Sequence, residues 1–223
     1  MELREYTSIR RAYNLVRQRV DSSSRLTFAE FAILCRLLNV GTSLKTSEIA
    51  EYQGSLRPTM THRTKHLSKL GLIERDKGDS DRRNVVCTIS DAGVAYVHEL
   101  CESACKEISA GHALARTTPE RICRYADAMG SVPCAAGELT LLGLYEAGVG
   151  SRSISQLVED LGLLQPTVSM SVAALEQEGM ITRVSEGEAK TLRVALSEAG
   201  RKAAEDLIDI ITDVIVRRKP RKH

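Results

Sequence analysis

The most informative part of the sequence is residues 57–93, which reads RPTMTHRTKHLSKLGLIERDKGDSDRRNVVCTISDAG. Pro58 suits the first turn of a helix, where no intrahelical N–H bond is lost to proline. Apolar side chains then recur at helical spacing over residues 58–70, and Gly71 is a typical helix stop. The stretch therefore opens with a predicted helix of about 13 residues that has one apolar face.

Two short runs with strand composition follow this helix, LIER at residues 72–75 and VVCTI at residues 85–89. The segment between them is too polar for anything but a hairpin tip, so the two runs predict a β-hairpin. Ser90 is a favourable N-cap for a long helix over residues 91–109.

Three helices are predicted upstream of residue 57. Apolar residues recur at helical spacing over residues 3–20, and Thr27-Phe28-Ala29-Glu30 is a capping box that opens a helix over residues 28–40. A short helix is predicted over residues 46–53. Three short helices followed by a two-stranded wing are typical of a winged helix-turn-helix domain.

The chain also repeats itself at an offset of about 108 residues. Pro58-Thr59 corresponds to Pro166-Thr167, and Ile89-Ser90-Asp91-Ala92-Gly93 corresponds to Leu196-Ser197-Glu198-Ala199-Gly200 after a one-residue deletion. Such a colinear series indicates two copies of one unit. We predict two domains, residues 1–112 and 113–223, each with its own winged helix-turn-helix. The second copy is expected to contain helices over residues 119–129, 137–147, 166–178 and 197–216, a capping box at residues 153–156 and a hairpin over residues 181–196.

The helix over residues 58–70 has one face that packs inward and one that is free to enter a major groove. The inward face consists of Met60, Thr64, Leu67 and Leu70. The outward face consists of Arg57, Thr59, Thr61, His62, Lys65, His66 and Lys69. Short hydroxyls can contact base edges and phosphates, and the cations can contact the DNA backbone. In the hairpin, Arg82 and Arg83 can reach a minor groove, with Asp81 beside them to orient a guanidinium.

These motifs together resemble the multiple-antibiotic-resistance regulator (MarR) family. The resemblance spans roughly residues 26–100 and rests on Pro58-Thr59-Met60-Thr61, Gly71-Leu72-Ile73-Glu74-Arg75, Asp81-Arg82-Arg83 and Ile89-Ser90-Asp91-Ala92-Gly93. It implies a mainly α-helical fold with small β-wings, fused here as a pseudo-dimer within one monomeric chain. It implies a sequence-specific regulator of transcription that binds double-stranded DNA, and we expect a repressor. His62 stands where the family commonly has Arg.

The second copy departs from the first in its charge. Residues 165–178 contain no Lys or Arg, and the counterpart of the Asp81-Arg82-Arg83 motif is Glu188-Ala189-Lys190. Its candidate DNA contacts are Gln165, Thr167, Ser169 and Lys190. Since the salt-dependent part of DNA affinity scales with the phosphates neutralised, we expect the N-terminal copy to dominate binding. Two alternatives stay open: the second copy is a sensor or protein-interaction half, or the whole chain is an interaction scaffold without DNA.

Composition narrows the remaining possibilities. The 223 residues include six cysteines, no Trp and only 4% aromatic residues, which argues against a stacking platform for single-stranded nucleic acid. The cysteines are scattered and no apolar signal segment precedes them, so we expect reduced thiols, a cytoplasmic location and no membrane span. No catalytic motif appears, so neither enzymatic activity nor a cofactor is expected.

Two further groups of residues are weaker candidates. His98, Cys101 and Cys105 lie at spacings of three and four on one predicted helix and could form a redox or metal site, although Cys and His on a helix are more often buried packing or interface residues. The MarR resemblance implies a small-molecule effector pocket near the helical interface. The polar-tipped residues in suitable helices are Tyr6, Arg10, Tyr13 and Tyr125.

Overall fold

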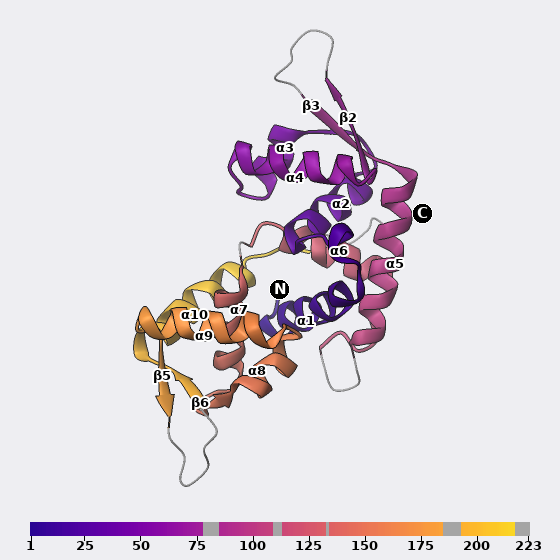
Figure 1. Ribbon diagram of the computed structural model, residues 1–223. Helices are drawn as coiled ribbons and strands as arrows, with labels where there is room; N and C mark the ends of the chain where they lie inside the picture. The colour runs from indigo at the N-terminus through magenta and orange to yellow at the C-terminus, as the bar shows by residue number, and fades with distance from the viewer. Residues whose placement is uncertain (78–84, 109–112, 133, 185–192, 217–223) are drawn as a thin grey trace. The chain divides into compact units, whose positions relative to one another are not determined.

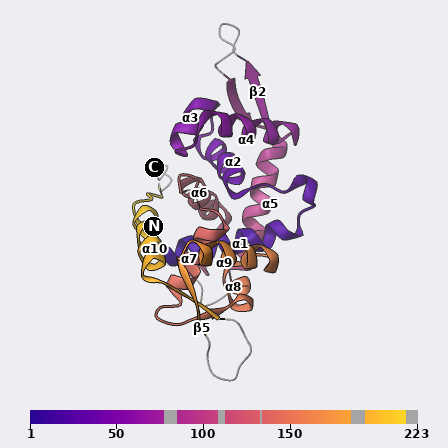
Figure 2. The same cartoon turned by 60° about the vertical axis from the view of Figure 1, so that its left-hand side comes forward.

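The computed structural model describes residues 1–77, 85–108, 113–132, 134–184 and 193–216. It is mainly helical and has two small antiparallel sheets, which confirms the predicted fold class of two winged helix-turn-helix regions (Figures 1 and 2). The chain forms two compact units. We call residues 16–132 with 214–223 the N-head unit, and residues 1–15 with 133–213 the C-head unit. Among the helices described, none is long and apolar enough to cross a membrane.

The N-head unit contains the end of α1 (Leu3–Arg19) and a complete winged helix-turn-helix. Its further elements are the 3₁₀ helix η1 (Ser22–Ser24), α2 (Phe28–Val40), β1 (Leu44–Lys45), α3 (Thr46–Tyr52), α4 (Arg57–Lys69), β2 (Ile73–Lys77), β3 (Val85–Ile89), α5 (Asp91–Glu107) and α6 (Pro119–Met129). The sheet has the strand order β1-β3-β2 and is antiparallel throughout, with Ile73 opposite Ile89. Helix α6 packs against α2 and α5.

The predicted start and end of α2 are confirmed. Thr27 accepts a hydrogen bond from the Glu30 amide while the Glu30 carboxylate accepts one from the Thr27 amide, which completes the capping box. The helix ends at Gly41, whose φ of 70° is a left-handed conformation that favours glycine. Most apolar residues of α2 are buried, so this helix forms the centre of the N-head core.

The C-head unit repeats this arrangement. It contains most of α1 (Leu3–Arg19), followed by α7 (Ala136–Glu146), β4 (Arg152–Ser153), α8 (Ile154–Leu161), α9 (Gln165–Gln177), β5 (Ile181–Val184), β6 (Arg193–Leu196) and α10 (Glu198–Thr212). Its sheet has the equivalent strand order β4-β6-β5. Leu157, Val168 and Val194 are fully buried in its core, and Ser153 and Gln156 form the predicted capping box of α8.

The repeated Ser-Asp/Glu-Ala-Gly motif has the same structural role in both units. The hydroxyl of Ser90 donates to the Gly71 carbonyl and accepts from the Gly93 amide, at 2.6 and 3.0 Å, so it both caps α5 and ties it to the end of α4. Ser197 makes the matching bonds to Gly179 and Gly200 at 2.7 and 3.0 Å. The repeat therefore preserves the joint between recognition helix, wing and following helix.

The structure differs from the predicted elements in three respects. The two-residue strands β1 and β4 were not predicted, because two residues carry no recognisable alternation. The last helix ends at Thr212 rather than at residue 216. The structure also corrects the predicted division between residues 112 and 113, since the leading helix of each copy packs largely with the other copy.

Hydrogen bonds show why α1 belongs with the C-head unit. Asn14 Nδ2 donates to the Leu161 carbonyl at 2.9 Å, and Arg11 Nε donates to the Glu159 carbonyl at 2.9 Å. Both bonds satisfy carbonyls near the C-terminus of α8, which lack partners within their own helix. Conversely α6, from the predicted second domain, lies on α2 in the N-head unit. A purely sequential division misses this exchange.

Gly93 offers a test of the joint between the wing and α5. A Cβ at this position would overlap the Leu72 carbonyl oxygen, whereas a Cβ at Gly137, also in a first helical turn, meets nothing within 4 Å. We expect Gly93→Ala to lower the free energy of unfolding by about 1–3 kcal/mol. Gly137→Ala should be neutral or stabilising because Ala favours helices. Urea denaturation measures both, and equal stability of the two variants would contradict the close-approach argument.

Candidate nucleic-acid interface

Helix α4 lies in the N-head with the predicted division between its two faces. Met60, Thr64 and Leu67 are fully buried against the rest of the unit. The Thr64 hydroxyl donates to the Met60 carbonyl at 3.0 Å, so burying it leaves no unpaired donor. Leu70, predicted to be the fourth inward residue, is only partly buried and forms the C-cap.

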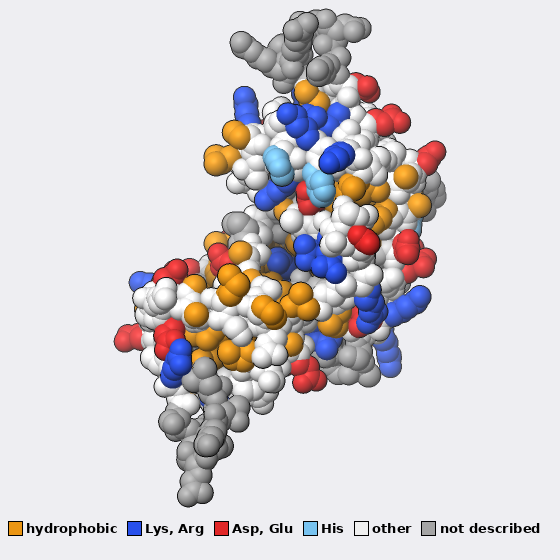
Figure 3. Space-filling view, in the orientation of Figure 1, with side chains coloured by type: hydrophobic (Ala, Val, Ile, Leu, Met, Phe, Trp, Pro, Cys, Tyr) orange, Lys and Arg blue, Asp and Glu red, His pale blue; other side chains and the backbone are white. Residues whose placement is uncertain are grey.

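The opposite face of α4 carries the predicted DNA contacts. The exposed residues of this face are Arg57, Thr59, His62, Lys65 and Lys69, and Thr61 is partly buried. The helix contains no carboxylate, and Figure 3 shows Lys, Arg and His side chains gathered over it. Its N-terminal amides add a further positive potential. We call the five exposed residues with Thr61 the α4 face.

His66 is the exception among the predicted contacts. Its Nδ1 lies 2.7 Å from Oε1 of Glu30, and only a third of its side chain is exposed. Glu30 itself is 4% exposed and also accepts hydrogen bonds from the amide and hydroxyl of Thr27. His66 thus joins α4 to α2, and the structure corrects its role from a groove contact to a residue that positions the α4 face.

The residues of the predicted wing tip, Asp81, Arg82 and Arg83, lie outside the described residues. What the structure shows is the ladder that leads to them, from the pair Ile73–Ile89 to the pair Lys77–Val85. The third strand β1 extends this sheet, and the Thr46 hydroxyl donates to the Val85 carbonyl at 3.1 Å. The base of the wing is therefore fixed to the helix-turn-helix.

The equivalent surface of the C-head is uncharged and partly apolar. Gln165 is exposed and Thr167 and Ser169 are partly buried, while Met170 and Leu164 expose 74% and 51% of their surface. Figure 3 shows hydrophobic side chains exposed in this part of the molecule. Lys190, the fourth predicted contact of this head, lies outside the described residues.

On the C-head surface, a salt bridge neutralises the charge of Arg183. Arg183 donates two hydrogen bonds to Glu176, each at 2.6 Å, and this pairing lowers the pKa of the Glu176 carboxyl. The equivalent position in the first head is Ser68, so α4 offers no such acceptor to Arg75. The two heads thus share a fold and differ in the charge they present.

The four residues predicted to line an effector pocket are instead buried. Tyr6 and Tyr13 are at most 2% exposed, and Arg10 donates to the Tyr6 hydroxyl at 3.1 Å and to the Cys134 carbonyl at 3.0 Å. Burial raises the pKa of Tyr6 above its ordinary value. Tyr125 is 7% exposed and accepts a hydrogen bond from Arg121. The polar tips of Tyr6, Arg10 and Tyr125 thus have partners within the protein.

A cavity of about 740 Å³ lies within the N-head unit instead, and none of the four predicted residues lines it. Its lining comes from α2, α3, α5, α6 and the segment after α10. The polar part includes Arg36, Asn39, Tyr52, His98, Glu120, Arg124 and Asp127. Burial raises the pKa of Asp127, although its carboxylate accepts a hydrogen bond from Asn39 at 3.1 Å. Sequence reasoning missed this cavity because its lining is scattered over five segments.

The predicted set His98, Cys101 and Cys105 is only partly brought together. Cys101 lies beside Cys35 of α2 and Cys123 of α6, and the three sulfurs are within 4.8 Å of one another. Cys105 is not part of this cluster, and His98 lies on the neighbouring cavity wall. Hydrogen bonds from the two other thiols lower the pKa of Cys123, while burial raises the pKa of Cys35. The sequence gives no signal for the approach of Cys35, which is 66 positions from Cys101.

The fold and the α4 face define a tandem winged helix-turn-helix protein with one basic head. Residues 26–85 match the model of the MarR family, and residues 144–183 match the helix-turn-helix model "Bacterial regulatory protein, arsR family". The predicted MarR resemblance is confirmed for the first head, and the second match falls in the other head. Both models describe transcription regulators, so together they support a DNA-binding transcription regulator.

Comparisons with curated proteins and with solved structures do not extend this assignment. No curated protein matches the sequence significantly. A solved structure concerned with regulation of DNA binding of Bordetella bronchiseptica BpsR by 6-hydroxynicotinic acid is 23% identical, with a TM-score of 0.37, over 50% of this chain and 80% of that one. A likeness this weak supports no conclusion about this chain.

Glu30 tests how the α4 face is held. We expect Glu30→Ala to lower the free energy of unfolding by about 1–3 kcal/mol, because it removes a capping contact and leaves His66 without its partner. Glu51→Ala, at an exposed position of α3, should change it by less than about 0.5 kcal/mol. Thermal or urea denaturation measures both. A loss no larger for Glu30→Ala than for Glu51→Ala would show that the buried contact is not stabilising.

Proposed function

We propose that the chain is a sequence-specific double-stranded DNA-binding repressor in which the N-head supplies most of the affinity. The single observation that carries this proposal is the α4 face, an exposed stripe of cations and hydroxyls on the third helix of a winged helix-turn-helix. Such a stripe can neutralise phosphates and present short polar groups to base edges. Arg83, oriented by Asp81, is proposed to enter the minor groove, as the MarR resemblance implies.

The asymmetry between the heads is supported by the surface of α9. Where α4 exposes Lys65, α9 has Ala173, and where α4 exposes His62, α9 exposes Met170. The C-head can still donate hydrogen bonds to phosphates, without adding much charge, through Gln165, Thr167, Ser169 and Lys190. Because counterion release scales with the phosphates neutralised, the second head should add less salt-dependent affinity. We propose that one chain acts as a monomeric pseudo-dimer on a single operator.

The asymmetry can be tested with two variants of equal charge change at equivalent positions. Lys65→Ala and Ala173→Glu each lower the net charge by one unit, the first by removing a cation from the N-head and the second by adding a carboxylate to the C-head. With a duplex selected from a random pool, we expect Lys65→Ala to lower the salt slope of log K by about 1. Ala173→Glu should leave the slope nearly unchanged. Fluorescence anisotropy over a range of salt concentrations measures both.

Four outcomes of the selection, the titration and a footprint would speak against the proposal. Equal losses in both variants would contradict the asymmetry, and a selected motif with two equivalent half-sites would do the same. Failure of the wild-type chain to retain any duplex would favour the interaction-scaffold alternative. A footprint of one half-site, with a C-head partner recovered separately, would favour the sensor or protein-interaction reading of the second copy.

We also propose that the N-head cavity binds a small-molecule effector with an anionic group. Arg36 and Arg124 line it together with apolar side chains, and a cavity of about 740 Å³ is within the usual size of ligand sites. Arg36 lies over the Tyr52 ring at 3.7 Å and 3.8 Å from Asp127, so Arg124 is the better candidate for an anion. A ligand that favours one conformation of the head would shift its DNA affinity.

Benzoate is a suitable first probe for the cavity because it combines an aromatic ring with a carboxylate. We expect millimolar benzoate to raise the melting temperature of the wild type by mass action, and Arg124→Ala to lose most of that shift. Arg116→Ala, a substitution outside the cavity lining, is the control and should keep the shift. Equal shifts in all three proteins would place the binding elsewhere.

A further inference from the structure

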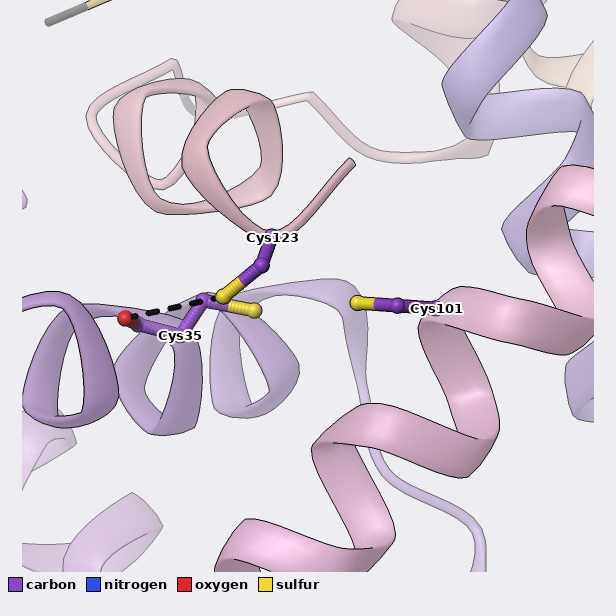
Figure 4. Close-up of side chains that lie close together, drawn as sticks. All are labelled: Cys35, Cys101 and Cys123. Carbon is purple, nitrogen blue, oxygen red and sulfur yellow. Dashed lines mark hydrogen bonds between the residues drawn. The ribbon is translucent and has the colours of Figure 1, made fainter. Parts of the chain in front are cut away.

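The cluster of Cys35, Cys101 and Cys123 is the most concentrated set of metal-ligating atoms in the part of the chain that the structure describes. Each cysteine comes from a different helix, namely α2, α5 and α6. Figure 4 shows the three sulfur atoms turned toward one another between these helices. The residues are 0%, 1% and 5% exposed. The fold thus brings three thiols from separate helices together before any ion binds.

From this geometry we propose that Cys35, Cys101 and Cys123 form a three-thiolate site for a divalent d¹⁰ ion of the zinc class. Metal–sulfur bonds of about 2.3 Å at tetrahedral angles separate the sulfurs by about 3.8 Å. The sulfurs here lie within 4.8 Å of one another, so the site needs to contract by at most about 1 Å. Small rotations about the Cα–Cβ bonds of the three cysteines supply a change of this size.

Charged groups near the cluster can offset the net negative charge that the site would carry with an ion bound. Three thiolates and a divalent cation carry one residual negative charge, which a buried site must offset. His98 and Arg124 interact favourably with the thiolate form of Cys123, and Asp127 opposes them. The Cys123 thiol donates a hydrogen bond to the amide oxygen of Asn39 at 3.7 Å, and this bond is given up when the thiol loses its proton. On binding, the ion replaces the protons of the three thiols, which pass to solvent.

The cavity supplies an entry path and room for a fourth ligand. Cys101 and Cys123 line its wall, whereas Cys35 lies behind them and lines no part of it. An ion entering from the cavity meets two thiols first and the third beyond them. The coordination position facing the cavity stays open to water or to a small ligand, which is the arrangement of three protein ligands typical of a reactive zinc site. This inference does not depend on DNA binding.

The alternative is that the three thiols only pack as small apolar groups, as buried cysteines often do. The two readings differ in what alanine does. If the cysteines only pack, Ala substitutions alter stability and no ion binds with high affinity. If they form a site, binding of an ion links α2, α5 and α6 and raises the stability of the N-head unit by mass action.

Cobalt(II) is the appropriate probe because its visible absorption reports the number of thiolate ligands and the coordination geometry. We expect the reduced full-length chain to bind one equivalent with the intense bands of a thiolate-rich, four-coordinate site, and zinc to displace it. Cys35→Ala and Cys123→Ser should each weaken binding by more than about 100-fold, beyond the loss typical of outer-shell changes. The melting temperature of the wild type, and not of these variants, should rise with zinc.

Cys105→Ala is the matched control, since this cysteine lies one turn beyond Cys101 on α5 and outside the cluster. It should keep both the cobalt bands and the zinc-dependent melting shift. Circular dichroism checks that each variant is folded. If Cys35→Ala does not fold, Cys123→Ser serves as the test variant, because Cys123 is the most exposed of the three residues. Absence of thiolate–cobalt bands in the reduced wild type, or their loss in Cys105→Ala alone, would overturn the proposal. Neither result bears on the DNA titration.

Discussion

The N-head depends on how one buried carboxylate is satisfied. Glu30 is 4% exposed, and a carboxylate this far from water is tolerated only when its oxygens are hydrogen-bonded. It accepts from the amide and hydroxyl of Thr27 at 2.8 and 2.9 Å, and lies 2.7 Å from His66 Nδ1. The first two bonds fix the start of α2, and the third fixes the rotation of α4 about its own axis. The same residue therefore caps one helix and orients the next.

That orientation decides which side of α4 faces solvent. With His66 held against α2 and Met60, Thr64 and Leu67 buried, the remaining stripe must be exposed. A rotation by a single residue, about 100°, would bury a cation and expose a Met or Leu. The cost of an unpaired buried charge makes such a rotation unfavourable. The presentation of the α4 face is thus a consequence of packing inside the head.

Most of the fold could be predicted from the sequence because its signals are local. The capping boxes at Thr27 and Ser153, the helix stop at Gly41 and the strand pair around Val85–Ile89 each depend on residues within one or two turns. The basic character of α4 was equally visible, because the charge of a helix face follows from its spacing. The internal repeat then extended each local inference to the other half of the chain.

What the sequence could not show depends on contacts between distant segments. His66 has the spacing of a groove residue, and only its contact with Glu30, 36 positions earlier, shows that it positions the helix instead. Tyr6, Arg10 and Tyr13 have polar tips, yet those of Tyr6 and Arg10 meet partners inside the protein. The exchange of α1 and α6 between the units is equally nonlocal, since hydrogen bonds such as that from Asn14 to Leu161 span more than 140 residues.

Helix α2 connects the separate features of the N-head. It carries Glu30, which orients α4, and five residues later Cys35, which meets Cys101 and Cys123; Arg36 and Asn39 then line the cavity. Because most of α2 is buried and closely packed as far as Leu37, a shift near Cys35 cannot be absorbed locally. Anything that draws α5 and α6 toward Cys35, or that fills the cavity beside Arg36, acts on the same rigid helix that holds His66. The structure thus offers a short mechanical route from the interior of the head to the α4 face, about two turns of helix in length.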